Sequence, residues 1–230
     1  RKLVKEYLTQ SFVLYKPKDI VAGDFYWLEH TQNAVLFAAA DCTGHGVPGA
    51  FVSMVGSNLL NQSVRKKGLT KPSDILDDVN IEVQETLQKD VDSAVKDGMD
   101  IALCSFDPKS GSIKYSGANN NLYLVKEDGE LVEFKAGKQP IGAFDYKSDF
   151  ETYEVEYSSG DTLYLFSDGY ADQFGGPKGK KLKYSNFKRL LLENRTRSME
   201  DQKMFYSTTI EEWRGEIEQI DDICLMGVRM

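Results

Sequence analysis

Two segments of the sequence share one design, in which a run of apolar residues ends in an aspartate and a glycine follows shortly after. In LFAAADCTG the run ends at Asp41, and in LYLFSDG it ends at Asp168. A short apolar run bounded by turn residues is typical of a strand that is buried on both faces. Each segment therefore predicts a buried strand that delivers a carboxylate into a glycine turn.

Further strands are predicted from alternating or buried apolar runs that turn residues separate. With the two above, the predicted strands cover residues 11–15, 24–30, 34–41, 99–107, 112–118, 121–126, 131–135, 150–157, 161–168 and 222–230. Turns such as DPKSG and EDGE indicate antiparallel strands joined by hairpins. The segment GGPKGKK is predicted to be a surface loop.

Helices are predicted in pairs between these strands. After Gly46 the apolar residues recur at helical spacing and predict a helix with one apolar stripe: Val47, Phe51, Met54, Val55, Leu59 and Val64. A second helix is predicted over residues 70–88, and two more around 187–192 and 199–213. Hairpin-connected strands with paired helices predict one α+β domain, in which helix pairs cover antiparallel sheets. The first ten residues have helical spacing and are interpreted as the end of an upstream helix.

The composition limits the classes of function. The chain has 230 residues, of which 41% are hydrophobic and 28% charged, as in an ordinary globular domain. Its net charge of -8 disfavours non-specific binding to nucleic acid or to anionic lipid. Three widely spaced cysteines indicate reduced core thiols in a cytosolic protein, rather than a disulfide framework or a zinc site. The sequence has no apolar run long enough to span a membrane.

Aspartates recur at the ends of the predicted strands. Besides the two that end apolar runs, they open strands or lie near their start: Asp24, Asp100, Asp221 and Asp222. Any one of them is explained by the preference of aspartate for strand ends and turns. Together they favour a shared site, because clustered carboxylates repel one another unless cations neutralise them. Oxygen ligands without histidine or cysteine suit Mg²⁺ or Mn²⁺, and a backbone carbonyl near Cys42 is a further candidate ligand.

The segments DIVAGDFYW, DCTGHGVPGAF, KQPIG, LFSDGYAD and DDICLMGVR have the order and spacing of the metal-dependent (PPM, type 2C) serine/threonine protein phosphatases. From about Phe12 to Arg229 the chain most resembles the bacterial SpoIIE-type branch. The resemblance implies a four-layer αββα sandwich, in which helix pairs flank two antiparallel β-sheets. It also implies a phosphatase domain over residues 12–230, preceded by the end of a signalling helix at residues 1–11.

The resemblance implies that two ions, Mn²⁺ or Mg²⁺, activate a water that hydrolyses phosphoserine or phosphothreonine. It assigns the ligands to four carboxylates and one backbone carbonyl: Asp24, Asp41, Asp168, Asp221 and the carbonyl of Cys42. Asp41 would bridge both ions, and the Cys42 carbonyl would bind one of them. Asp24 would hold a metal directly or through water. Asp222 would support the ligands without touching an ion.

Two departures from the family pattern concern the phosphate and the leaving group. Eukaryotic members carry a phosphate-binding arginine where this chain reads KPKDIV, so Lys16 or Lys18 is either a substitute or a solvated lysine. The histidine proposed there as the acid corresponds to Thr43. His45 lies two residues further on, and we expect it to form hydrogen bonds or shape the loop.

A third departure concerns an additional metal. Many bacterial relatives have an aspartate in the middle of the domain that binds a third ion, whereas YSGANNNLYL offers Asn119 and Asn120. Asp100 is either a local replacement or a solvated strand residue.

The resemblance also implies a place in signalling. Such domains usually end a bacterial sensor protein, and their usual substrate is a phosphorylated anti-sigma-factor antagonist. We therefore expect a cytoplasmic domain that dimerises through the N-terminal helix. Its parent protein is either free or anchored to a membrane. The alternatives are a catalytically silent phosphoprotein-binding module of the same fold and a metal-dependent hydrolase of small phosphoesters. The retained carboxylates favour a protein phosphatase.

Overall fold

Strand β3 (Val35–Cys42) lies at the centre of the layered fold. In the computed structural model, which describes residues 6–87, 97–142 and 148–230, almost every residue of this strand is buried. Side chains on a strand alternate between its two faces. Val35 and Phe37 face the space between two sheets, whereas Leu36 and Ala38 face a pair of helices. The continuous apolar run is therefore the signature of a strand with cover on both sides.

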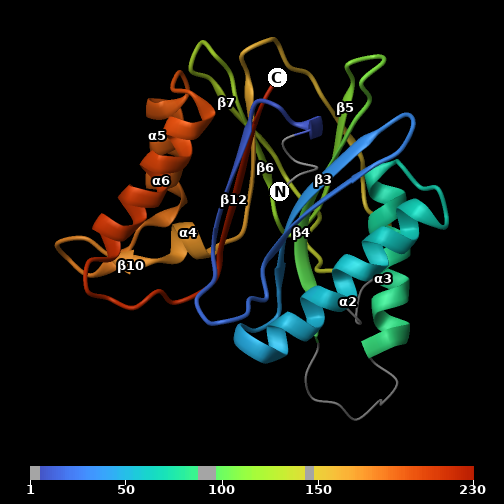
Figure 1. Cartoon of the computed structure of the whole chain (residues 1–230), viewed down its shortest axis with the longest axis horizontal. Coiled ribbons are helices and arrows are strands. Elements are labelled where there is room, and N and C mark those ends of the chain that lie inside the picture. Colours follow the sequence, from blue (N-terminus) through green and yellow to red (C-terminus); the bar gives the residue numbers. More distant parts are fainter. Residues whose placement is uncertain (1–5, 88–96, 143–147) are drawn as a thin grey trace.

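The described strands form two five-stranded antiparallel sheets that pack face to face (Figure 1). The first sheet has the order β1-β12-β9-β6-β7 and comprises Ser11–Lys16, Ile223–Arg229, Thr162–Phe166, Leu122–Val125 and Leu131–Phe134. The second has the order β2-β3-β4-β5-β8 and comprises Phe25–His30, Val35–Cys42, Met99–Phe106, Ile113–Ala118 and Tyr153–Val155.

A pair of helices covers the outer face of each sheet (Figure 1). Helices α2 (Gly46–Arg65) and α3 (Pro72–Leu87) pack on the second sheet, and α5 (Lys183–Asn194) and α6 (Met199–Arg214) pack on the first. Apolar side chains fill all three interfaces between these layers. The predicted α+β fold of two antiparallel sheets flanked by helix pairs is confirmed.

Short elements follow β9 that the sequence did not predict. Residues Gly169–Asp172 form the one-turn helix α4, and Phe174–Gly175 (β10) pairs with Lys180–Lys181 (β11). The segment GGPKGKK, interpreted as a surface loop, thus comprises Gly175 of β10, the tip of a small hairpin and both residues of β11. This hairpin lies beside the lower ends of the strands in Figure 1.

The helix predicted after Gly46 is present as α2, but its apolar stripe is exposed in the first half of the helix. Val47, Phe51 and Met54 are 63–69% exposed. The residues that pack inward are one position further along the helix or in its second half: Val52, Leu59, Leu60 and Val64. Apolar residues lie on both sides of the first turns of α2, so the spacing alone does not identify the buried side.

Other predictions are confirmed within the part of the chain that the structure describes. All three cysteines are buried and unpaired. No described helix is long and apolar enough to cross a membrane. The predicted N-terminal helix is wrong at its end: Glu6 and Tyr7 are helical, but residues 8–10 are not and Ser11 begins β1, while residues 1–5 lie outside the described residues. Gln88, the last residue of the predicted 70–88 helix, also lies outside them.

Candidate metal centre

Acidic residues of the second sheet gather at one end of the sandwich, the lower end in Figure 1. Asp41 is the last residue but one of β3, and it lies directly opposite Asp100 of β4. Asp24 immediately precedes β2, whose first residue, Phe25, pairs with Ala40. Residues opposite each other in antiparallel strands point to the same face. Antiparallel pairing therefore places these three carboxylates at one edge of the sheet.

The first sheet contributes acidic residues at the same end. Asp168 follows β9 directly and precedes α4, and Asp221 and Asp222 directly precede β12. The Ser167 N–H donates to the Cys224 carbonyl at 2.9 Å, which holds the end of β9 beside the start of β12. All six predicted acidic positions therefore meet at one end of the sandwich.

The carboxylate of Asp222 joins the two sheets. It is 1% exposed, and one oxygen accepts the Lys18 N–H at 2.7 Å while the other accepts the Gly23 N–H at 2.7 Å. The Asp24 N–H points at that second oxygen at 3.4 Å. A buried carboxylate that accepts several backbone N–H groups makes strong, charge-assisted hydrogen bonds. Asp222 therefore fixes the loop that presents Asp24 to the other acids.

Glycines allow the loops of the site to touch. A Cβ added at Gly169 would overlap the carbonyl oxygen of Asp222, so the turn after β9 packs directly on the loop before β12. A Cβ added at Gly23 would overlap the Gly44 carbonyl oxygen and lie 3.2 Å from that of Cys42. The Cys42 carbonyl oxygen therefore points toward the segment that carries Asp24.

Burial and mutual repulsion raise the pKa values of three of these carboxyls. The pKa of Asp41 rises to about 9, chiefly because of burial and then because of the charges of Asp24, Asp168, Asp221 and Asp100. Burial likewise raises the pKa of Asp24 to about 7, and the nearby Asp222 charge adds to this while Ser167 opposes it. The pKa of Asp168 rises to about 6, from burial and from the charge of Asp221. The carboxyls of both sheets thus share one electrostatic field, and each disfavours the ionisation of the others.

The residues present fit a divalent cation. Oδ2 of Asp24 is buried and has no hydrogen-bond partner, although an unpaired buried carboxylate oxygen is unfavourable. A cation would satisfy that oxygen and remove the repulsion that raises the pKa values. In the described residues, no group of three or more His, Cys, Asp or Glu side chains is already arranged to hold an ion. Binding would therefore require the carboxylates to close on the cation.

Asp100 faces the other acids and is not simply a solvated strand residue. Its carboxylate accepts a hydrogen bond from the Asn119 side chain at 2.8 Å, and its charge contributes to the raised pKa of Asp41. Burial raises the pKa of Asp100 itself. Asn119 has a positive φ of 55°, and its side chain holds Asp100 at the edge of the cluster.

The structure separates the two candidate lysines. Lys16 forms an ion pair with Glu211 of α6, which occupies its ammonium group. Lys18 donates its backbone N–H to Asp222, and its Nζ lies 3.1 Å from Nε2 of His45. Nδ1 of His45 lies 2.8 Å from the carboxylate of Asp19. His45, which directly precedes α2, thus forms the hydrogen bonds expected of it and ties the 17–23 loop to the start of the helix.

Two residues of the site were not singled out in the sequence. The Ser167 hydroxyl accepts the Cys224 N–H at 2.9 Å and lies close enough to Asp24 to lower its pKa. Lys181 of β11 pairs with Asp172 at 2.7 Å, and its charge opposes the rise in the pKa of Asp168. The position of Ser167 directly before Asp168 indicates in the sequence that Ser167 lies near the site. Lys181 gave none, because only the β10–β11 hairpin brings it back to the site.

Comparisons with known proteins agree with this geometry. The family model described as "Stage II sporulation protein E (SpoIIE)" matches residues 31–230. The chain is 25% identical over 155 residues to the phosphoserine phosphatase RsbU of Bacillus subtilis (strain 168), a match that covers 66% of this chain and 44% of RsbU. The chain thus spans less than half the length of this curated relative.

Solved structures show the same fold. The SiaA-PP2C domain of Pseudomonas aeruginosa superimposes with a TM-score of 0.90 at 30% identity, covering 100% of this chain and 89% of that one. RsbX, solved in complex with magnesium, superimposes with a TM-score of 0.58 at 14% identity, covering 96% of this chain and 94% of that one. The architecture described above is therefore that of PP2C-type domains.

Proposed function

The chain belongs to the SpoIIE family, and on that premise we propose that it is a metal-dependent protein phosphatase domain that hydrolyses phosphoserine or phosphothreonine. The observation that carries the proposal is the meeting of carboxylates from two sheets, with pKa values raised by burial and then by one another's charges, and with one buried oxygen unpaired. Homologues named as serine phosphatases support the same activity.

Five oxygen ligands would hold two ions, Mn²⁺ or Mg²⁺: the carboxylates of Asp24, Asp41, Asp168 and Asp221 and the carbonyl of Cys42. Asp41, which lies in the electrostatic field of acids from both sheets, would contribute its carboxylate to holding the ions. Bound ions would supply a water of lowered pKa and neutralise the phosphate. Such hard cations prefer oxygen ligands, in agreement with the absence of His and Cys side chains from the set.

The chain's own residues would orient the reaction. Asp222 would hold Asp24 in position through the backbone of the 17–23 loop, which directly precedes Asp24, without binding an ion. Asp41, Asp168 and Asp221 are partly exposed, so the acidic end is open to solvent. An open site suits a phosphorylated side chain on a protein surface better than a small phosphoester that needs enclosure.

The proposal extends to the protein's setting. We infer a phosphatase domain over residues 12–230 in the cytoplasm, acting on a phosphorylated protein. An anti-sigma-factor antagonist is the substrate that the resemblance to this branch favours. A homodimer through the segment before residue 12 is the corresponding proposal for assembly.

The test is hydrolysis of p-nitrophenyl phosphate and of a phosphoserine peptide, with Mn²⁺, with Mg²⁺ and with a chelator. Turnover should require a metal and disappear in Asp41→Asn. Asp161→Asn is the control, since Asp161 is also a buried aspartate but lies at the opposite end of β9. A folded protein without turnover in either metal would refute the enzyme and favour the silent phosphoprotein-binding module.

A further inference from the structure

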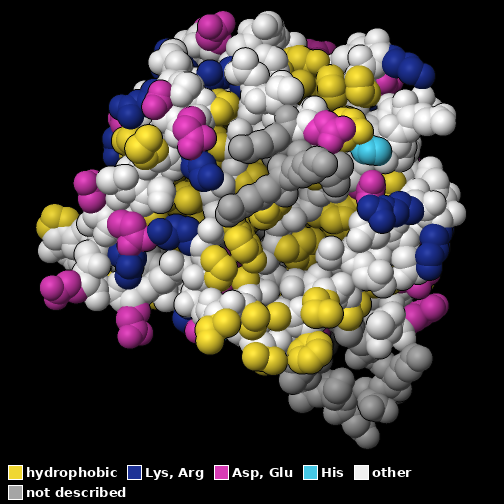
Figure 2. Space-filling view, in the orientation of Figure 1, with side chains coloured by type: hydrophobic (Ala, Val, Ile, Leu, Met, Phe, Trp, Pro, Cys, Tyr) yellow, Lys and Arg dark blue, Asp and Glu magenta, His cyan; other side chains and the backbone are white. Residues whose placement is uncertain are grey.

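Large apolar side chains are exposed beside the acidic end of the molecule. Four of them, here called the apolar rim, lie on the 17–23 loop and on the first half of α2: Ile20, Val47, Phe51 and Met54. Ile20 is fully exposed, and Met54 is 69% exposed. Figure 2 shows hydrophobic side chains gathered at the lower edge of the molecule, over the first half of α2.

The rim is not needed to pack the domain. The inward side of α2 contributes Val52 and Leu60, which pack with the second sheet and α3. Val47, Phe51 and Met54 recur at intervals of four and three residues, so they form one continuous outward stripe. Further along the outward side, Asn58 and Asn61 line a shallow groove that begins at Met54. The exposed apolar stripe is thus confined to the part of α2 nearest the acids.

The rim lies within reach of the carboxylates. Ile20 precedes Asp24 by four residues, so their Cα atoms are at most about 14 Å apart. The first turn of α2 also lies close to Asp24, because a Cβ added at Gly49 would lie 2.9 Å from the Cα of Gly23, the residue before Asp24. A protein interface of standard size covers about 800 Å² on each partner, a disc of about 16 Å radius. A protein substrate with its phosphoserine at the acids would therefore cover the rim.

We propose that the apolar rim is the docking surface for the substrate segment that flanks the phosphorylated residue, and that this segment carries an apolar side chain toward Phe51 and Met54. The inference rests on the proposed phosphatase function. A contact radius of about 16 Å corresponds to about five extended residues, so the apolar side chain lies within five positions of the phosphoserine. Acidic flanking residues would be disfavoured by the net charge of -8.

The experiment uses phosphoserine peptides on a serine-glycine background, in which a single leucine is moved through positions one to five on each side. Leucine at a preferred position should raise kcat/KM about tenfold over the all-polar peptide. The double variant Phe51→Ser, Met54→Ser should lose this preference. It should keep its rate on p-nitrophenyl phosphate, which is too small to reach the rim.

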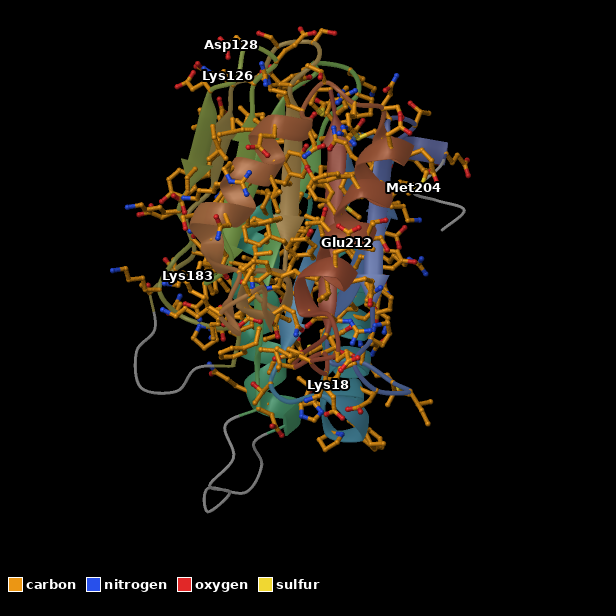
Figure 3. All side chains as sticks on the ribbon, turned by 90° about the vertical axis from the view of Figure 1, so that its left-hand side faces the viewer. Lys18, Lys126, Asp128, Lys183, Met204 and Glu212 are labelled. Carbon is orange, nitrogen blue, oxygen red and sulfur yellow. The ribbon has the colours of Figure 1, made fainter. Side chains whose placement is uncertain are left out.

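Met204→Ser is the matched control. Met204 is 60% exposed, but it lies on α6, far from the end of the molecule that carries Lys18 (Figure 3). This variant should keep both the leucine preference and the rate on p-nitrophenyl phosphate. If the double variant fails to fold, Ile20→Ser replaces it, since a fully exposed loop residue contributes nothing to the core.

The outcomes separate this inference from the proposed function. If the protein shows no metal-dependent turnover of p-nitrophenyl phosphate, the proposed phosphatase function itself is refuted. Normal turnover with no leucine preference, or with a preference that the double variant retains, would overturn the docking surface alone. A dimer of the wild-type chain that the double variant converts to monomers, with the preference unchanged, would assign the rim to contacts between copies and also overturn the proposal.

Discussion

Replacing Asp222 by asparagine should weaken both the fold and the activity. The two carboxylate oxygens of Asp222 accept the backbone N–H groups of Lys18 and Gly23 at 2.7 Å, and the second oxygen also accepts that of Asp24 at 3.4 Å. Asparagine keeps one acceptor but turns an NH₂ group toward the other N–H. One buried N–H then loses its partner, at a cost of about 1–3 kcal/mol, and the other bond loses its charge, at about 1 kcal/mol. The free energy of unfolding should fall by about 3 kcal/mol.

A loss of this size is readily measured. For a domain of this length it lowers the melting temperature by about 6–12 °C. Activity should fall further than stability requires, because the loop that carries Asp24 is no longer held. Residues that orient metal ligands contribute about 10–100-fold to activity or metal affinity. We expect kcat/KM, measured well below the melting temperature, to fall by at least about tenfold, and half-activation to need more metal.

Asp161 offers a closely matched control. It is 3% exposed, and its two oxygens accept the N–H groups of Glu127 and Ser158 at 2.9 and 2.8 Å. It lies at the end of the molecule that carries Lys126 and Asp128, opposite the end with Lys18 (Figure 3). Asp161→Asn should lose comparable stability and keep its kcat/KM. Equal loss of activity in both variants, or none in either, would refute the role assigned to Asp222.

Three further predictions concern the acids and their supporting turn. The metal-free protein should lose stability between pH 6 and pH 9. The pKa of Asp41 is about 9 in the folded protein and 3.8 in the unfolded chain. In this range the unfolded chain has already released the Asp41 proton, whereas the folded protein still holds it, so rising pH favours the unfolded chain. In chelator, the melting temperature should fall as the pH rises across this range, and it should fall less in Asp41→Asn. Added Mn²⁺ should reverse the trend. A melting temperature that rises with pH in chelator would contradict the raised pKa assigned to Asp41. Gly169→Ala should lower the free energy of unfolding by about 1–3 kcal/mol and remove most of the activity, because the new methyl group overlaps the Asp222 carbonyl. Gly137→Ala is the control: its Cβ would make only ordinary contacts of 3.5 Å or more, so this variant should retain activity in the same assay. Asp100→Asn should lower the pKa of Asp41 in the metal-free protein by removing a nearby charge, so the fall in melting temperature between pH 6 and pH 9 in chelator should be smaller than in the wild type. An unchanged fall would contradict the contribution assigned to Asp100.

The sequence by itself determined the order and type of the main elements. A two-residue period and turn residues identify strands locally, and a 3.6-residue period identifies helices, because these patterns reflect which side of each element is buried. The same local logic placed Asp41 and Asp168 at the ends of buried strands. It failed where an element has apolar residues on more than one side, as in the first turns of α2, where Phe51 proved to be exposed.

Only the tertiary structure decided what those strand ends do together. Asp222 and Gly23 are 199 positions apart in the chain, and they meet because β1 pairs with β12, which places the loop after β1 beside Asp222. The raised pKa of Asp41 likewise depends on burial between the layers and on charges brought from the opposite sheet. Local periodicity encodes burial but not the meeting of distant segments. The physical reason is that carboxylate repulsion, close glycine contacts and an exposed apolar rim are properties of neighbours in space, which no single stretch of the chain contains.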